Sequence, residues 1–290
     1  MFTLAHLSDW HLASRPALPE LIGKRGLGYI NWHRGRKKIH RPDVLDATIR
    51  DLKAEAPDHI AVTGDLVNLS LPDEYNRARG WLQTLGSPRD VTLVPGNHDI
   101  YVRSVQQAPA KYWADYMRGD DGLDRFPFVR RRGNVVLIGL STALPTAPLL
   151  ATGRLGKRQL ARLLEILDPT RGSFRIVLIH HPPLTSRQRY LRRLVDAADL
   201  RGVLADQGAE LLLHGHDHRR AVVWLDGPQK KIPAVGVPSA SARGKHGDEN
   251  AAGYNLFRIE GSLIKWSCEM IAHERDADGT MREVVRQTLI

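Results

Sequence analysis

The stretch VTLVPGNHDI, residues 91–100, joins two kinds of sequence that seldom occur side by side. Its first four residues have the composition of a buried strand. Pro95-Gly96 then ends the strand, and the glycine lets the backbone turn closely. Three polar side chains follow on the same turn, namely Asn97, His98 and Asp99. Because such side chains are poor core material, the stretch predicts a strand that ends at a polar site.

The same transition from apolar to polar occurs at four other places. The runs Thr3–Leu7, His59–Thr63, Arg175–Ile179 and Glu210–Leu213 are each followed by side chains that can bind a metal ion. In order, these are Asp9 and His11, Asp65, His180 with His181, and His214, His216 and His218. In an open α/β sheet the carboxyl ends of parallel strands share one edge, where ligands bind. We therefore expect all five clusters to converge on one site.

Helical patterns alternate with these strands and with the further apolar run Val135–Leu140. The predicted helices are Asp43–Glu55, Lys157–Leu167 and Tyr190–Ala205. This alternation predicts an α/β fold with a largely parallel sheet. From about residue 220 the chain becomes rich in strands without helices, which suggests antiparallel additions or a second sheet: Ala221–Leu225, Ala234–Val237, Tyr254–Ile259 and Leu263–Met270. With no linker and no repeat, a single domain over residues 1–290 is expected.

Composition limits the class of protein. The chain has 290 residues, of which 42% are hydrophobic and 26% charged, as in ordinary globular proteins. A single cysteine, Cys268, excludes an internal disulfide and a zinc site of several thiolates. The first residues do not resemble a signal peptide, and no stretch approaches the ~20 apolar residues of a membrane helix. The expected location is the cytoplasm.

The charge is strongly basic and unevenly distributed. The formal net charge is +10, and cations are concentrated in residues 24–41, 130–132 and 187–193. Such a balance is compatible with an anionic substrate, nucleic acid or an anionic membrane surface, and also with a plain solvated surface. The clustering favours an anionic partner.

Each polar motif also has an ordinary structural explanation. Asp9 and Asn97 could be turn residues, Asp65 could cap a helix, and His180 could be a hydrogen-bonded core histidine. The pair His216 and His218 is a stronger signal, because alternate residues on an extended segment point the same way. Five independent coincidences at the same kind of location are improbable, so the motifs must be interpreted together.

Together, the order Asp-x-His, Gly-Asp, Gly-Asn-His-Asp, His and Gly-His-x-His resembles the calcineurin-like metallophosphoesterase superfamily. The resemblance runs from Asp9 to His218. It implies a four-layer α/β/β/α sandwich of two facing mixed sheets flanked by helices. It also implies two divalent metal ions, one held by Asp9, His11 and His218, the other by Asn97, His180 and His216, with Asp65 bridging both. Carboxylate, amide and imidazole ligands suit Mn, Fe, Zn or Co.

The expected chemistry follows from the charge of a phosphodiester. Two cations offset that charge, clamp the attacking and leaving oxygens, and lower the pKa of a bridging water toward neutrality. His98 follows a ligand and is the expected acid for the leaving oxygen, a role worth ~10²–10⁴-fold. Asp99 is expected either to orient and charge-support His98 or to cap the loop. His181 is expected to support a ligand or to face the substrate.

Finer features favour one class of substrate. Asn68 and the Gly-Asn-His-Asp block resemble bacterial class III cyclic-nucleotide and glycerophosphodiester phosphodiesterases. The stretch GDLVNLS, residues 64–70, lacks the arginine and glycine that the protein Ser/Thr phosphatase branch carries soon after its Gly-Asp. Hydrolases of nucleotide-linked diacylglucosamine often carry arginine where this chain has His98. The leading prediction is therefore a phosphodiesterase acting on a small anionic phosphoester.

The stretch LIGKRGLGYINWHRGRKKIHRP, residues 21–42, is rich in both basic and apolar residues. It is interpreted as an insertion at about residues 20–42. Its glycines make a stable helix doubtful. It could be a plain loop, a lid over a large substrate, or a peripheral membrane contact through residues 21–41. Membrane contact would favour a nucleotide-linked lipid or sugar pyrophosphate as the substrate.

Two further classes are less favoured. A nuclease would use the same metals, but such relatives add a DNA-binding cap for which little chain remains after His218, so a nucleic-acid partner is not expected. A non-catalytic scaffold of the same fold would show degraded ligand blocks, whereas every block here is intact. The sequence does not predict an oligomeric state.

Overall fold

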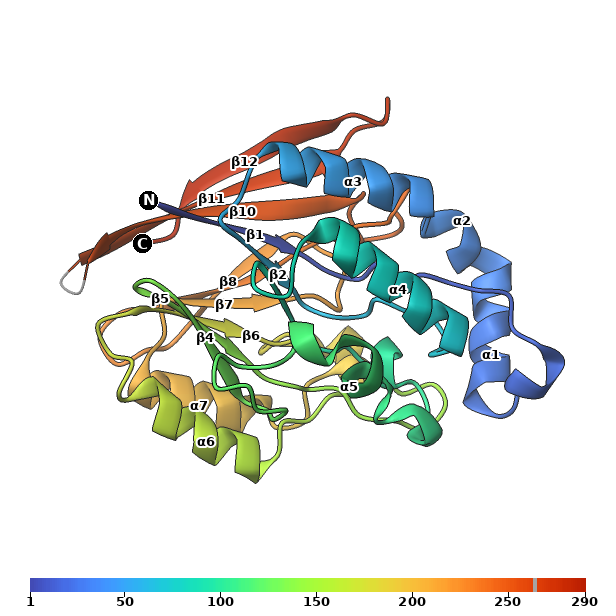
Figure 1. Cartoon of the computed structure of the whole chain (residues 1–290), viewed down its shortest axis with the longest axis horizontal. Coiled ribbons are helices and arrows are strands. Elements are labelled where there is room, and N and C mark those ends of the chain that lie inside the picture. Colours follow the sequence, from blue (N-terminus) through green and yellow to red (C-terminus); the bar gives the residue numbers. More distant parts are fainter. Residues whose placement is uncertain (263–264) are drawn as a thin grey trace.

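The computed structural model describes residues 1–262 and 265–290 and contains two six-stranded sheets (Figure 1). The first sheet has the order β12-β11-β10-β1-β2-β3. Its strands are β1 (Phe2–Leu7), β2 (His59–Val62), β3 (Val91–Leu93), β10 (Gly253–Ser262), β11 (Lys265–Arg275) and β12 (Met281–Thr288). The second sheet has the order β4-β5-β6-β7-β9-β8. Its strands are β4 (Phe128–Arg132), β5 (Val135–Gly139), β6 (Phe174–Leu178), β7 (Leu211–His214), β8 (Ala221–Leu225) and β9 (Ile232–Gly236).

Each sheet combines parallel and antiparallel strands. In the first sheet β1, β2 and β3 are parallel, and β10 pairs antiparallel with β1. In the second sheet β5, β6, β7 and β9 are parallel, whereas β4 and β8 pair antiparallel with their neighbours. The strand-rich C-terminal part thus divides between the sheets: β8 and β9 extend the second, and β10 to β12 extend the first.

Both faces of the second sheet are buried, and alternate residues along a strand face opposite sides of it. On β5, Val135 and Leu137 belong to the core shared with the first sheet, whereas Val136 and Ile138 belong to a second cluster. That second cluster also contains apolar residues of α6 (Lys157–Leu167) and α7 (Ala197–Gln207). Figure 1 shows both helices against the outer face of this sheet. Strands buried on both sides are nearly continuously apolar, which explains the runs seen in the sequence.

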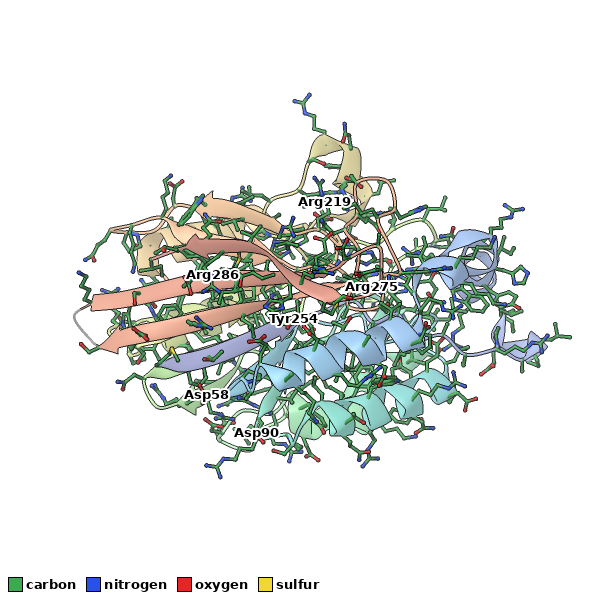
Figure 2. All side chains as sticks on the ribbon, turned by 90° about the horizontal axis from the view of Figure 1, so that it is seen from above. Asp58, Asp90, Arg219, Tyr254, Arg275 and Arg286 are labelled. Atoms are coloured by element: carbon green, nitrogen blue, oxygen red, sulfur yellow. The ribbon has the colours of Figure 1, made fainter. Side chains whose placement is uncertain are left out.

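The first sheet is covered by α3 (Pro42–Ala54) and α4 (Pro72–Leu85), while α5 (Ala108–Trp113) packs beside α4. Leu45, Ile49 and Leu52 repeat at helical spacing on α3 and are buried in the shared core. Tyr254 on β10 donates a 2.6 Å hydrogen bond to Asp51, which fastens α3 to the sheet (Figure 2). The predicted sandwich of two mixed sheets flanked by helices is confirmed.

The predicted helix Tyr190–Ala205 is wrong in its first part. A 3₁₀ turn at Arg187–Arg192 precedes an extended residue, and α7 begins only at Ala197. The cause is Asp196, whose carboxylate accepts hydrogen bonds from the backbone amides of Leu155 and Gly156 at 2.7–3.1 Å. This tie holds the chain out of a helix just before α7.

The basic segment is helical, contrary to the expectation from its glycines. It forms α1 (Lys24–Asn31), a π-helical turn at Trp32–Arg36, and α2 (Lys37–Ile39). A Cβ at Gly28 would lie 2.6 Å from Tyr101 Oη and 2.7 Å from a methyl group of Leu69. Glycine therefore permits a close approach that stabilises the helix by packing. Figure 1 shows α1 at the end of the molecule opposite the chain termini.

Two strands escaped prediction, β4 within the arginine cluster at 130–132 and β12 near the C-terminus. Residues 263–264 of the predicted strand Leu263–Met270 lie outside the described residues, and the remainder lies in β11. No helix in the described part of the chain is long and apolar enough to span a bilayer.

Candidate metal centre

The strand ends of both sheets meet, and the seven side chains predicted as metal ligands lie together and buried at this junction. Five of these residues have left-handed backbone angles, which residues other than glycine rarely adopt: Asp9 (φ 58°), His11 (48°), Asp65 (55°), His216 (70°) and His218 (53°). Backbone amides of the first loop donate to the second, from Asp9 to Gly64 and from His11 to Asp65. Such strain persists only where surrounding structure holds it, and it is typical of functional sites.

One group of ligand atoms comes from Asp9, His11 and His218. The Nε2 atoms of the two histidines lie 2.9 Å apart, and Asp9 Oδ1 lies 3.3 Å from His218 Nε2 and 3.7 Å from His11 Nε2. The other ring nitrogen of His218 hydrogen-bonds to Glu249 at 3.0 Å. This contact orients the ring so that Nε2 faces the group.

A second group comes from Asp65, Asn97, His180 and His216. His180 Nε2 lies 3.3 Å from Asp65 Oδ2, 3.2 Å from Asn97 Oδ1 and 3.2 Å from His216 Nδ1. The opposite nitrogens donate to backbone carbonyls, from His180 to Thr63 at 2.6 Å and from His216 to Arg192 at 2.9 Å. Each imidazole therefore directs its other nitrogen toward the group.

These contacts fit metal ions. Asp9 Oδ1 is buried and forms no hydrogen bond within the described part of the chain. Burial disfavours charge on His180 and His218, yet the neighbouring carboxylates of Asp65 and Asp9 raise the pKa of both rings to about 9. The carboxylates thus attract positive charge to these positions. Asp65 belongs to ligand groups with His180 and His216 and with His11 and His98, as expected of a residue between two ions.

His40 is a site residue that sequence reasoning missed. Its ring centroid lies 4.5 Å from that of His11, and one of its nitrogens falls within 4.8 Å of ligand atoms of His11 and His218. Its Nδ1 hydrogen-bonds to Ser241 at 3.0 Å and Ser239 at 3.2 Å. Because His40 follows α2 rather than a strand, the pattern that found the other ligands could not find it.

His98 is fixed at both ring nitrogens. Nδ1 donates a 2.6 Å hydrogen bond to the Asn68 carbonyl, and Nε2 accepts from Arg36 Nη1 at 3.2 Å. The ring stacks on Tyr101 with centroids 5.2 Å apart. Burial lowers the pKa of His98 to about 4, so the ring is neutral near pH 7. Arg36 and Tyr101 were not among the predicted site residues.

Asp99 does not support His98 in the way its position suggested. Its carboxylate accepts hydrogen bonds from the backbone amides of Asp65, Leu66, Val67 and Gly96 at 2.8–3.2 Å. The 3₁₀ turn His98–Ile100 directs the carboxylate back into the loops. Asp99 thus joins two of the loops that carry ligands, and the loop-capping alternative describes it better.

His181 is likewise structural. It is buried, and its two nitrogens hydrogen-bond to Thr142 Oγ1 at 2.7 Å and to the Ala151 carbonyl at 3.0 Å. Its ring centroid lies 4.3 Å from that of His216. Of the two predicted alternatives, support of a ligand agrees with these contacts.

A cavity of about 470 Å³ opens over the ligand groups. Its floor contains His11, Asp65, Asn97, His98, His216 and His218. Its wall contains Lys24, Leu27, Ile30, Arg34 and Arg36 from the basic segment. Tyr101, Leu149 and Arg192 complete the rim. The basic segment therefore contributes to the cavity of the candidate site.

Comparison with known proteins agrees with this site. Residues 2–220 match the family described as Calcineurin-like phosphoesterase. A glycerophosphodiester phosphodiesterase of Enterobacter lignolyticus is 36% identical over 96 residues, which are 33% of this chain and only 29% of that protein. A cAMP/cGMP dual specificity phosphodiesterase of Mycobacterium tuberculosis is 29% identical over 277 residues, covering 89% of this chain and 76% of that protein.

The fold is shared with a dimetal phosphatase from Danio rerio, with a TM-score of 0.64 and 14% identity over 99% of this chain and 98% of that one. The family match covers most of the chain and includes every predicted ligand block. The predicted family, fold and general enzyme class, a metal-dependent phosphoesterase, are thereby confirmed. This chain belongs to the calcineurin-like phosphoesterase family.

Proposed function

We propose that this protein is a phosphodiesterase that uses two divalent metal ions. Asp9, His11 and His218 would hold one ion, Asn97, His180 and His216 the other, and Asp65 both. The observation that carries the proposal is the position of Asp65, within reach of ligand atoms on both sides. Mn, Fe, Zn and Co all accept this mixture of oxygen and nitrogen ligands.

The bound ions would supply positive charge to the phosphoryl oxygens and would activate water. The chain's own contribution to substrate binding is cationic. Lys24, Arg34, Arg36 and Arg192 line the cavity, and such side chains attract and orient a phosphodiester anion.

His98 is proposed to protonate the leaving oxygen. Asn68 fixes Nδ1 as the protonated nitrogen, so Nε2 is the atom that faces the cavity. Arg36 now donates to Nε2. A phosphate anion that draws Arg36 to itself would free Nε2 and favour its protonation, because a nearby negative charge stabilises the imidazolium. The proton could then pass to the leaving oxygen.

Phosphodiesters are favoured over monoesters by two observations. Both relatives described above carry the name phosphodiesterase. The cavity has a volume of about 470 Å³, which leaves space for substituents on two oxygens of the phosphate. A cyclic nucleotide or a glycerophosphodiester satisfies both observations. A cytoplasmic location remains a prediction.

The test starts from metal-stripped protein reloaded with Mn, Zn or Fe in turn. Hydrolysis of bis-p-nitrophenyl phosphate is compared with that of p-nitrophenyl phosphate, and cyclic AMP and glycerophosphocholine are assayed beside them. We expect faster turnover of the diester with at least one metal. Preference for the monoester, or no turnover with any metal, would contradict the proposal.

A further inference from the structure

Exposed apolar side chains surround the mouth of the cavity. Leu149 is 87% exposed, Leu27 52% and Ile30 48%, and all three line the cavity. Leu18 and Ile22, which precede α1, are also exposed. Single exposed leucines are ordinary on a protein surface, but a group of them at the entrance of a site is typical of a surface that binds an apolar ligand.

The structure holds these apolar side chains in place. Lys24 Nζ donates to Thr146 Oγ1 at 2.6 Å and to the Leu150 carbonyl at 3.2 Å, which ties α1 to the loop that carries Leu149. Leu149 has a φ of 68°, an angle that a bulky side chain rarely adopts. A glycine or asparagine would suit both this backbone and this exposure better. The described part of the chain leaves Leu149 largely uncovered, so a ligand at the rim would supply the apolar contact that its side chain lacks.

Cations line the same cavity as the apolar rim. Lys24, Arg34, Arg36 and Arg192 line the cavity, and Asp65 is the only carboxylate among the described residues that line it. Arg36 also touches His98 on the floor. The cavity thus combines a cation that touches its floor with apolar side chains at its rim. This combination is complementary to an anionic head that carries an apolar chain.

We propose that the substrate of this site is an amphiphilic phosphoester, with the phosphate among the cations and an alkyl or acyl chain lying along Leu27, Ile30 and Leu149. The inference rests on the proposed phosphodiesterase function and narrows its substrate class. The alkyl or acyl chain of the substrate takes no part in bond breaking. Water adds its oxygen to phosphorus, the ester bond to the leaving oxygen breaks, and that oxygen takes up a proton. α1 has eight residues and is about 12 Å long, long enough to contact a medium alkyl chain.

The test uses a series of alkyl p-nitrophenyl phosphates, namely methyl, butyl and octyl, below their micellar concentrations with the metal-loaded protein. The kcat/KM should rise with chain length, by up to about fourfold for each methylene that becomes fully buried. In Leu27→Ser/Ile30→Ser and in Leu149→Ser, the octyl-to-methyl ratio of kcat/KM should fall toward one. Leu164→Ser, an exposed leucine of α6 away from the cavity, should keep the wild-type ratio.

The outcomes separate this inference from the proposed function. If none of the three esters is hydrolysed, the proposed function fails. If the methyl ester is hydrolysed and the wild-type ratio is near one, the function stands and the amphiphilic substrate is refuted. Sedimentation with vesicles of phosphatidylglycerol and phosphatidylcholine adds a third measurement. A flat ratio with vesicle binding that Leu149→Ser abolishes would assign the rim to a membrane surface and overturn the inference.

Discussion

The floor and the wall of the cavity are built in different ways. The floor consists of buried residues that follow strands, several of them held at left-handed backbone angles. The wall from Lys24 to Ile39 contains no buried residue, although it is helical throughout. A rigid floor suits metal ions and the reacting phosphate, which require fixed geometry, whereas a peripheral wall can vary in sequence and so adapt to different substrates.

Several contacts join the floor to the wall, and two of them lie next to the ligand groups. Arg36 donates to His98, and His40, which directly follows the wall, hydrogen-bonds to Ser241 beside the floor. If the floor binds the metal ions and the wall selects the substrate, substitutions in the floor should alter metal content and turnover. Changes in the wall alter mainly KM and the choice of substrate. Changes at four residues, taken from the largest expected effect to the smallest, test this difference between floor and wall.

Asp65→Asn should have the largest effect. The amide lacks the negative charge that two ions would share, so metal affinity should fall by more than the ~10–100-fold loss seen when a residue that only supports a ligand is changed. Metal content per chain, measured by mass spectrometry after dialysis, and kcat should fall together. Asp73→Asn, on the exposed start of α4, is the control. Two ions per chain at unchanged affinity would show that Asp65 is not shared.

His98→Ala should keep both ions and slow the reaction. A diester with a poor leaving group, which needs a proton, should lose ~10²–10⁴-fold in kcat. A p-nitrophenyl ester should lose much less, because its leaving group departs without a proton. His246→Ala, an exposed histidine, is the control. Equal losses with both leaving groups would mean that His98 positions the phosphate instead of protonating the leaving oxygen.

The sequence predicted the floor well because its residues follow a regular pattern. His180 and His216 are recognisable because each comes directly after a buried strand, and strand ends converge in this kind of fold. The sequence left two roles open for Asp99, because adjacency to His98 suggested a contact, whereas a 3₁₀ turn directs its carboxylate to backbone amides. Neighbours in sequence need not be partners in space.

The wall could not be predicted in the same way. His40 meets Ser241 from 201 positions away, and no periodicity relates the two residues. The glycines of α1 argued against a helix on propensity alone, but Gly28 packs against Tyr101, a contact that propensity does not include. Tertiary packing, which is invisible in a single sequence, decided both features.

His40→Ala tests whether the wall reaches the first ion. If a His40 nitrogen binds or orients that ion, metal affinity in a chelator competition should fall by about 10–100-fold. Ser241→Ala leaves the ring but removes its 3.0 Å hydrogen bond, so a smaller loss is expected. Unchanged affinity in both variants would place His40 with the substrate-binding wall and sharpen the boundary between the two regions.

Changes at Lys24 should have the smallest effect, which is on KM and depends on pH. Burial lowers the pKa of Lys24 to about 8, so its positive charge is present below that pH and lost above it. The KM for a phosphodiester anion should therefore rise between pH 7 and pH 9. Because Lys24 is only half-buried and solvent screens its charge, its attraction for the anion contributes about 0.2–1 kcal/mol, which corresponds to roughly 1.5–5-fold in KM.

Two substitutions at Lys24 separate this effect from the pH dependence of the floor. Lys24→Arg keeps a positive charge at pH 9, so its KM should stay nearly flat where that of the wild type rises. Lys24→Met lacks the charge at every pH, and its KM should match the high-pH value of the wild type throughout. Since neither change touches a ligand of the ions, kcat should follow the same pH profile in all three proteins. A rise in KM that persists in Lys24→Arg would assign the titration to the floor, and the wall would then contribute shape and apolar surface but no titrating charge.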